Sequence, residues 1–466
     1  MIKVEPSSFR DPASNVYHIN NNIYRRVKLD TKLNFRIFLN SNFYKKNEDK
    51  IIKTRILEQK DLKFLKIPKK LSGNNILWLQ HEKILNIIYP YEMCFDQLKD
   101  SATFFLEILE NSILNSYDLS DATPYNVQFK SNKPIFIDIT SFTKLDKNSF
   151  FIGYKQFCES YLSPLVLSSF SEINFNDLYR SNLNGMDLKV VSKLLPKYSY
   201  FNLNIFTNIH FHAFLNSKIK STSHQKKLSK RKTLNFNNKL RLIKNLKNFI
   251  KKLELKESSY WQDYSKFNSY NSIATSHKKN LVKDFIITNK INRILDLGSN
   301  DGTYSQIAYD LNVKEICCVD NDSTALNRVY KRFKHKDIEF NAIYQNFMDP
   351  SPDLGWRNNE RKSFYRRFKN KFDGLICLAF IHHICIGNNV PLEQFINYIT
   401  KFSKHILLEF VPKNDPMVKN MIFNKQGLLE NYSLENLKEK IKKDNIIKKI
   451  LPIKNTKRKL IFFERK

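Results

Sequence analysis

The chain has 466 residues, of which 42% are hydrophobic, and its 78 Lys and Arg against 45 Asp and Glu give a net charge of +33. This length exceeds what one core supports and predicts two domains, and the charge indicates either a polyanionic partner or a coding bias towards lysine. No apolar stretch is long enough to cross a bilayer, and the six cysteines form no C-x-x-C pair, so we expect no metal site and a reducing, cytoplasmic location.

The N-terminal part, residues 1–215, is predicted to be an α+β domain. The runs at 15–18 and 23–27 are separated by asparagines, a pattern typical of a β-hairpin. The runs at 127–129 and 135–137, separated by a Ser-Asn turn, predict a second hairpin.

Three polar residues, Asp121, Asn126 and Asp138, surround the second hairpin. Their spacings of 5 and 12 residues resemble the catalytic and metal-binding loops of kinase-like phosphotransferases, in which an Asp orients a hydroxyl while an Asn and a second Asp hold Mg²⁺. No glycine-rich loop precedes them, and Leu119 stands where that family has a His. We therefore expect a kinase-like scaffold or an Asx-rich turn between strands, with phosphotransferase activity as an alternative function.

A basic segment follows, and we assign residues 216–257 to a helical linker. Only one acid, Glu254, occurs between Lys218 and Lys256. Apolar residues from Leu240 onwards recur at spacings of three and four, which predicts a basic amphipathic helix. Such a helix either docks on one domain or forms an arm that contacts a membrane surface or nucleic acid.

The C-terminal part, residues 258–466, begins with aromatic residues. Trp261 and Tyr264 precede the first predicted strand of this part. They could cap an adenine ring or a substrate, or they could fill the seam between the domains.

A glycine turn between predicted strands dominates this part. The strand at 294–297 ends in Gly298-Ser-Asn-Asp-Gly302, a helix is predicted at 303–311, and a second strand ends in Asp320. Ligands of such α/β sheets bind at the carboxyl ends of the strands, and glycines let the backbone approach them closely. Asp320 lies 320 − 296 = 24 residues after Asp296, where a carboxylate can accept both hydroxyls of a ribose. The pattern predicts a nucleoside-containing cofactor.

The turn lacks the third glycine of dinucleotide folds and the lysine of a P-loop. Its D-x-G-x-N-x-G pattern resembles motif I of class I methyltransferases that use S-adenosylmethionine (SAM). This resemblance implies that the loop cradles the methionine end of the cofactor, that the acid after the second strand holds the ribose, and that a polar residue after the third strand meets the adenine. The residues at these positions are Asp296, Gly298, Ser299, Asn300 and Gly302, then Asp320 and Asn321, and finally Asn346 and Phe347. A NAD-binding fold, or a turn without a ligand, is the alternative.

The remaining elements keep the order expected of this class. Continuous apolar runs at 372–380 and 405–411 are typical of buried parallel strands. The runs at 446–451 and 459–464 would form the closing antiparallel pair that such methyltransferases have. We thus expect an α/β fold: a Rossmann-like, mostly parallel sheet with an antiparallel closing strand, preceded by the α+β kinase-like domain.

Candidate catalytic and substrate residues follow from position. His382 and His383 end the fourth strand, and His is the side chain that titrates near neutral pH. If extended, the two would point to opposite faces, so at most one would line the pocket. The inserted stretch 351–371 is the expected place for substrate specificity. Its residues Trp356 and Arg361, together with Glu409 in strand five, are the candidate substrate contacts.

Several short motifs resemble one bacterial family of class I methyltransferases that includes rhizobial host-specific nodulation proteins. They are Ser8–Pro12, Tyr89–Glu92, Asp349–Trp356, Ala379–His383, Gly387–Pro391 and Glu409–Met417. The resemblance implies SAM as cofactor and methyl transfer to an oxygen or nitrogen of an unidentified acceptor, with a glycan or small molecule favoured over nucleic acid. An RNA-associated methyltransferase or RNA-binding protein is the other alternative.

Overall fold

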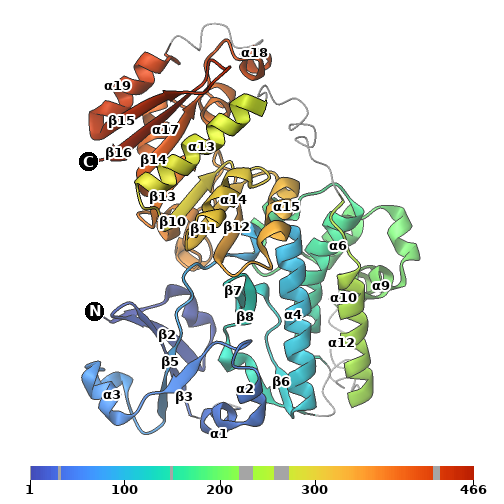
Figure 1. Cartoon of the computed structure of the whole chain (residues 1–466). Helices are drawn as coiled ribbons and strands as arrows, with labels where there is room; N and C mark the ends of the chain where they lie inside the picture. The colour runs from blue at the N-terminus through green and yellow to red at the C-terminus, as the bar shows by residue number, and fades with distance from the viewer. Residues whose placement is uncertain (1, 30–32, 147–150, 220–234, 257–271, 423–430) are drawn as a thin grey trace. The chain divides into compact units, whose positions relative to one another are not determined.

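The computed structural model describes residues 2–29, 33–146, 151–219, 235–256, 272–422 and 431–466 (Figure 1). The chain divides into two compact units. Unit 1 comprises Met1–Tyr91, Phe95–Lys256 and Asp353–Arg361, and unit 2 comprises Glu92–Cys94, Glu257–Pro352 and Lys362–Lys466. Among the helices described, none is long and apolar enough to cross a membrane.

Unit 1 contains a five-stranded antiparallel sheet in the order β1-β2-β3-β5-β4. Asn20 and Asn21, both with positive φ, form the two-residue turn between β2 and β3, because asparagine tolerates the left-handed conformation that a tight hairpin needs. The predicted first hairpin is therefore confirmed. The strands are β1 (Ile2–Val4), β2 (Ser14–Ile19), β3 (Asn22–Lys28), β4 (Thr54–Ile56) and β5 (Ile76–His81).

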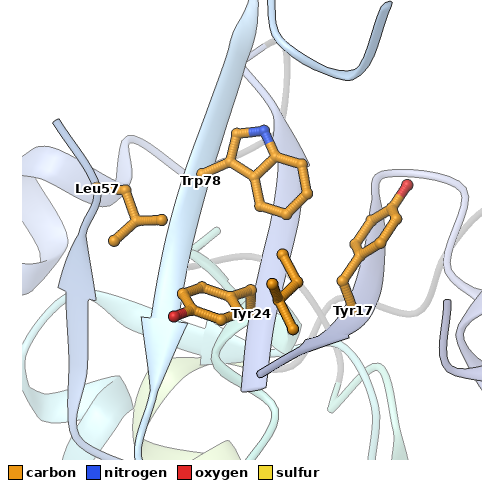
Figure 2. Close-up of a cluster of buried hydrophobic side chains, with 5 residues drawn as sticks. Tyr17, Tyr24, Leu57 and Trp78 are labelled. Atoms are coloured by element: carbon orange, nitrogen blue, oxygen red, sulfur yellow. The ribbon is translucent and has the colours of Figure 1, made fainter. Parts of the chain in front are cut away.

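An aromatic cluster covers one face of this sheet. Figure 2 shows Trp78 beside Tyr24 and Leu57, with Tyr17 across from them. The Tyr17 and Trp78 rings lie 5.0 Å apart between centroids and are tilted by 48°, an arrangement that aromatic pairs favour over face-to-face stacking. All four side chains are buried, so alternate residues of β2, β3 and β5 supply this core.

The second predicted hairpin is also confirmed. It consists of β7 (Val127–Lys130) and β8 (Lys133–Phe136), joined through Ser131 and Asn132 at positive φ. The short strands β6 (Tyr117–Leu119) and β9 (Phe142–Lys144) form a separate pair.

Two helices of unit 1 lie side by side, α4 (Phe95–Leu114) and α12 (Phe236–Lys251) (Figure 1). The predicted amphipathic helix is α12, and its apolar residues, including Ile243 and Ile250, are buried. The structure thus places this part of the predicted linker inside unit 1. Shorter helices of the unit are α1 (Phe35–Asn40), α2 (Asn42–Lys46), α3 (Gln59–Phe64), α5 (Tyr154–Phe157), α6 (Ser163–Phe170), α7 (Phe175–Arg180), α8 (Leu188–Leu194), α9 (Leu203–Ile205) and α10 (Phe211–Ile219).

Unit 2 is built on a seven-stranded sheet in the order β12-β11-β10-β13-β14-β16-β15. The pairs from β12 to β14 are all parallel, whereas β16 is antiparallel to both its neighbours. The predicted closing antiparallel pair and the α/β class with a mixed sheet are confirmed. The strands are β10 (Arg293–Leu297), β11 (Glu315–Asp320), β12 (Glu339–Tyr344), β13 (Phe372–Cys377), β14 (Ser403–Phe410), β15 (Asn445–Pro452) and β16 (Lys459–Arg465).

The strand order determines where a ligand can bind. After β10 the chain moves to β11 and β12 on one side and then returns to β13 on the other. The connections leave β10 and β13 in opposite directions, which opens a crevice at their carboxyl ends. The helices of this unit are α13 (Ser272–Thr288), α14 (Thr303–Asp310), α15 (Ser323–Phe333), α16 (Phe364–Phe368), α17 (Leu392–Ile399), α18 (Pro416–Ile422) and α19 (Leu434–Asp444).

Candidate functional site

A cavity of about 690 Å³ lies at these carboxyl ends in unit 2. Its size falls in the range of small-molecule sites. The cavity brings together most of the predicted cofactor-binding residues and one of the two predicted catalytic histidines. They are Asp296, Gly298, Ser299, Asn300, Asp320, Asn321, Asn346, Phe347 and His383.

The glycine turn shapes one wall of the cavity. Gly298 has φ +71°, and a Cβ built there would lie 2.6 Å from Cδ2 of Phe380. Any larger residue would be strained and would clash, so only glycine lets the Phe380 ring pack against this turn. Gly302, with φ +72°, does not line the cavity: its missing Cβ faces Val329 of α15 at 3.1 Å. The missing side chain lets α15 pack closely against the turn.

Two acids stand at the ends of the neighbouring strands β10 and β11. Asp296 is buried and accepts a hydrogen bond from Oγ of Ser305 at 2.6 Å. Burial raises the pKa of Asp296 from 3.8 to about 7, because an apolar setting disfavours the charged form. The two Asp320 oxygens accept the N–H groups of Asn300 at 2.8 Å and Asp322 at 2.9 Å. These bonds oppose the burial that raises the pKa of Asp320 to about 6.

The end of β12 contributes a polar and an aromatic group. Asn346 uses its Oδ1 to accept the N–H of Met348 at 2.9 Å, which fixes the turn after the strand. The Phe347 ring is held edge-on by Phe364, Phe380 and Tyr398 at centroid distances of 5.9, 5.5 and 6.1 Å. Such edge-to-face contacts fix a ring in orientation.

The two histidines have different environments. The chain turns into a helix at Ile381, so the extended geometry considered for the His pair does not occur. His383 lines the cavity, whereas His382 is completely buried and neither of its ring nitrogens has a hydrogen-bond partner among the described residues. Burial lowers the pKa of both, that of His382 to about 2. A neutral His383 can accept a proton at neutral pH.

A buried ionic cluster includes one cavity-lining residue, Lys278, and binds the backbone of another, Ala379. Nζ of Lys278 in α13 lies 2.5 Å from Oε2 of Glu409, and Oε1 of Glu409 lies 3.2 Å from Nη1 of Arg458. The Arg458 guanidinium also binds Asp415 through Nε at 2.7 Å and Nη2 at 2.9 Å. Oε2 of Glu409 additionally accepts the N–H of Ala379, which has an unusual φ of +48°. The cluster thus connects α13, β14 and the end of β13.

Glu409, predicted from the sequence as a substrate contact, is engaged with protein partners. The carboxylate has two buried cationic partners and does not line the cavity. Sequence reasoning missed Lys278 and Tyr304, which do line it, with Nζ of the lysine 4.7 Å from the tyrosine ring centroid. One lysine in a lysine-rich helix carries no distinguishing signal.

Two other predicted substrate contacts, Trp356 and Arg361, belong to unit 1 and not to the unit that holds the cavity. Trp356 is exposed, and the Arg361 guanidinium lies 4.1 Å from the Tyr125 ring centroid. Trp261 and Tyr264 fall outside the described residues.

The kinase-like residues of unit 1 are engaged with protein partners. Asp121 accepts hydrogen bonds from Asn126 at 2.9 Å and Gln156 at 2.5 Å. Asp138, expected as a metal ligand, lies 2.7 Å from Nη1 of Arg25. The described residues contain no group of three or more His, Cys, Asp or Glu side chains arranged to hold a metal ion.

Comparison with known proteins places these observations in context. No family model matches the chain. The nodulation protein NoeA of Rhizobium meliloti (strain 1021) is 31% identical over 469 residues, covering 98% of this chain and 95% of that protein. Similar solved structures include the N-methyltransferase NodS of Bradyrhizobium japonicum WM9 (10% identity, 42% of this chain and 98% of that one, TM-score 0.30). Another is the magnesium protoporphyrin IX methyltransferase of Synechocystis PCC 6803 with bound S-adenosylhomocysteine (12% identity, 48% of this chain and 95% of that one, TM-score 0.28).

Proposed function

This chain belongs to the family of the nodulation protein NoeA, and we propose that it is a class I SAM-dependent methyltransferase. One observation carries the proposal. The glycine turn after β10 and the acid that ends β11 line the same cavity, at the point where the order of the seven strands reverses.

The residues of the cavity fit the cofactor. Gly298 lines the cavity without a side chain, which would let its backbone approach the methionine end. The carboxylate of Asp320, oriented by two backbone N–H groups, would accept the ribose hydroxyls. Asn346 and Phe347 would meet the adenine. Bound SAM supplies a methyl group already activated on a sulfonium.

The protein then has to align a nucleophile and exclude water. His383 is the cavity residue suited to take a proton from a hydroxyl or ammonium acceptor, since burial keeps its ring neutral. We propose an oxygen or nitrogen acceptor on a glycan or small molecule. The proposed location is the cytoplasm, with which the free, mostly buried cysteines agree.

The alternatives have less support. An RNA-binding arm formed by α12 is disfavoured because Lys239 and Lys247 of this helix pair with Asp118 and Glu110. Phosphotransfer by unit 1 stays a prediction from spacing, and the pairing of Asp138 with Arg25 leaves that carboxylate poorly suited to hold Mg²⁺.

Titration calorimetry of the full chain with SAM tests the proposal. We expect a dissociation constant in the micromolar range for SAM and for S-adenosylhomocysteine, and none for NAD. Transfer of a labelled methyl group from SAM to amino sugars and glycan fractions would then identify the acceptor class. Failure to bind SAM would contradict the proposal. SAM binding that persists in the Gly298→Ala variant would contradict it as well.

A further inference from the structure

Unit 1 exposes an unusual concentration of apolar side chains. Of the 24 large hydrophobic side chains that are exposed in the described residues, ten lie between Val190 and Leu215. We call these ten the aromatic face. They are Val190, Leu194, Tyr198, Tyr200, Phe201, Leu203, Phe206, Phe211, Phe214 and Leu215.

Single exposed apolar residues need no explanation, but a contiguous group of this size marks an interaction site. Phe201 is 92% exposed and Leu203 is 74% exposed. Each apolar ring or aliphatic chain that stays in contact with water costs free energy, and covering it would recover that free energy.

The elements that carry the aromatic face pack together. It spans α8, the 3₁₀ turn Lys197–Phe201, α9, the π-helical turn Phe206–His210 and α10 (green in Figure 1), and these elements contact one another. The Phe206 ring lies 6.5 Å from Tyr200 and 6.2 Å from Phe211 between centroids. In α10, Phe214 and Leu215 follow Phe211 at spacings of three and four, so all three lie on one side of the helix.

The stretch of sequence that begins with the aromatic face is strongly basic. Residues 188–253 contain sixteen Lys and Arg and no Asp or Glu, so they supply +16 of the net +33. In α12 several of these charges are neutralised by acids of unit 1, as in the pairs Lys239–Asp118 and Lys247–Glu110. By contrast, Lys189, Lys193 and Lys197 beside the aromatic face are exposed and form no ion pair with the described residues.

We propose that the aromatic face binds the surface of a membrane rich in anionic phospholipids. Its Phe and Leu side chains would enter the boundary between headgroups and acyl chains, and the lysines would meet the phosphates. The aliphatic members favour lipid over single-stranded RNA, since Val190, Leu194 and Leu203 have no ring on which a base could stack.

Vesicle flotation with the full chain tests this proposal. The probes are vesicles of phosphatidylcholine alone and of equal parts phosphatidylcholine and phosphatidylglycerol, and we expect binding to the second kind only. Phe201→Asp should weaken partitioning at least about tenfold, because it removes one inserted ring and adds an anion. The matched control is Phe64→Asp, which places the same change at a side chain that is 84% exposed in α3 and should leave partitioning unchanged.

A second pair of variants tests the electrostatic part. Lys193→Glu should weaken binding about fivefold or more, since one lysine near an anionic surface contributes about 1 kcal/mol. The control is Lys133→Glu, at an exposed lysine of β8. Because Phe201 is almost fully exposed, we expect its variant to melt like the wild type. If the Phe201→Asp variant melts at a lower temperature than the wild type, Leu203→Asp provides the same test.

Three results would overturn the proposal. The first is the absence of phosphatidylglycerol-dependent flotation. The second is flotation that Phe201→Asp and Phe64→Asp reduce equally, because the net charge alone would then explain it. The third is binding of single-stranded RNA, or formation of a dimer, that Phe201→Asp abolishes while vesicles are not bound.

Discussion

Oδ2 of Asp320 accepts the backbone N–H of Asn300 at 2.8 Å, so the acid that ends β11 is tied to the glycine turn that follows β10. The bond fixes one carboxylate oxygen beside the turn, and the N–H of Asp322 fixes the other. Two features that are 20 residues apart in sequence thus act as one preorganised binding surface.

Replacing Asp320 should weaken SAM binding. Asp320→Ala removes the proposed acceptor of the ribose hydroxyls, and hydrogen bonds to a charged group contribute about 1.5–3 kcal/mol, or roughly ten- to a hundredfold in affinity. Calorimetry measures the change. Asp310→Ala, at the end of α14 and outside the cavity, should bind SAM like the wild type. Equal affinities for all three proteins would contradict the assignment of Asp320.

Gly298→Ala should abolish SAM binding and lower stability. The added Cβ would sit 2.6 Å from Phe380 at φ +71°, a conformation that costs about 1–2 kcal/mol for an L-residue. Gly73→Ala is the matched control, because its nearest neighbour would be Cδ1 of Ile76 at 3.9 Å and its φ is ordinary. Thermal melts with and without SAM distinguish the two variants. A SAM-induced stabilisation retained in Gly298→Ala would argue against the proposed cradle.

The acids of the cavity predict opposite pH dependences for folding and for binding. Burial raises the pKa of Asp296 from 3.8 to about 7, so the folded chain holds a proton that the unfolded chain has already released. The contribution of Asp296 to the free energy of unfolding is therefore fully present below pH 3.8 and is lost as the pH rises towards about 7. Urea unfolding at stepped pH measures it as the difference between the wild type and Asp296→Asn.

SAM affinity should change in the other direction. The carboxylate form of Asp320 is the better acceptor of ribose hydroxyls, and its pKa is raised to about 6. Affinity should accordingly increase as the pH rises through about 6. Asp320→Asn should flatten this profile, and an unchanged profile in that variant would assign the dependence to another group.

The two histidines should respond differently to substitution. His383→Gln should lower methyl transfer by about a hundredfold or more, the usual effect of losing a general base, and leave SAM affinity unchanged. His382→Leu should keep activity and leave stability unchanged or raise it by about 1 kcal/mol, because His382 is buried with no partner for either ring nitrogen among the described residues. A large loss of activity in His382→Leu, with His383→Gln active, would reverse the assignment.

Glu409→Gln should strongly destabilise unit 2. The substitution leaves Lys278 and Arg458, which are both buried, without the carboxylate they share, and breaking a buried pair in this way costs about 3–5 kcal/mol. Glu393→Gln breaks the exposed pair with Lys443 and should change stability little, because solvent screens an exposed ion pair. Chemical denaturation compares the two, and equal effects would show that the buried cluster is not structurally important.

The sequence indicated the strands of unit 2 and the glycine turn between β10 and α14 because their signals are local. Continuous apolar runs specify buried parallel strands, and glycines at Gly298 and Gly302 specify a turn with positive φ. The asparagine turn of the β2–β3 hairpin and the spacing of apolar residues in α12 are equally local, and both were predicted. An acid directly after an apolar run is also visible without knowledge of the fold, as at Asp320.

Only the tertiary structure decided the partners of each side chain. Lys278 and Glu409 are 131 residues apart, and nothing in either segment indicates that they form a buried pair. The helical start at Ile381 separates the environments of His382 and His383, and Trp356 and Arg361 belong to unit 1 although they lie between two strands of unit 2. Local sequence determines backbone conformation and burial, whereas the contacts of a polar side chain depend on which distant segments pack beside it.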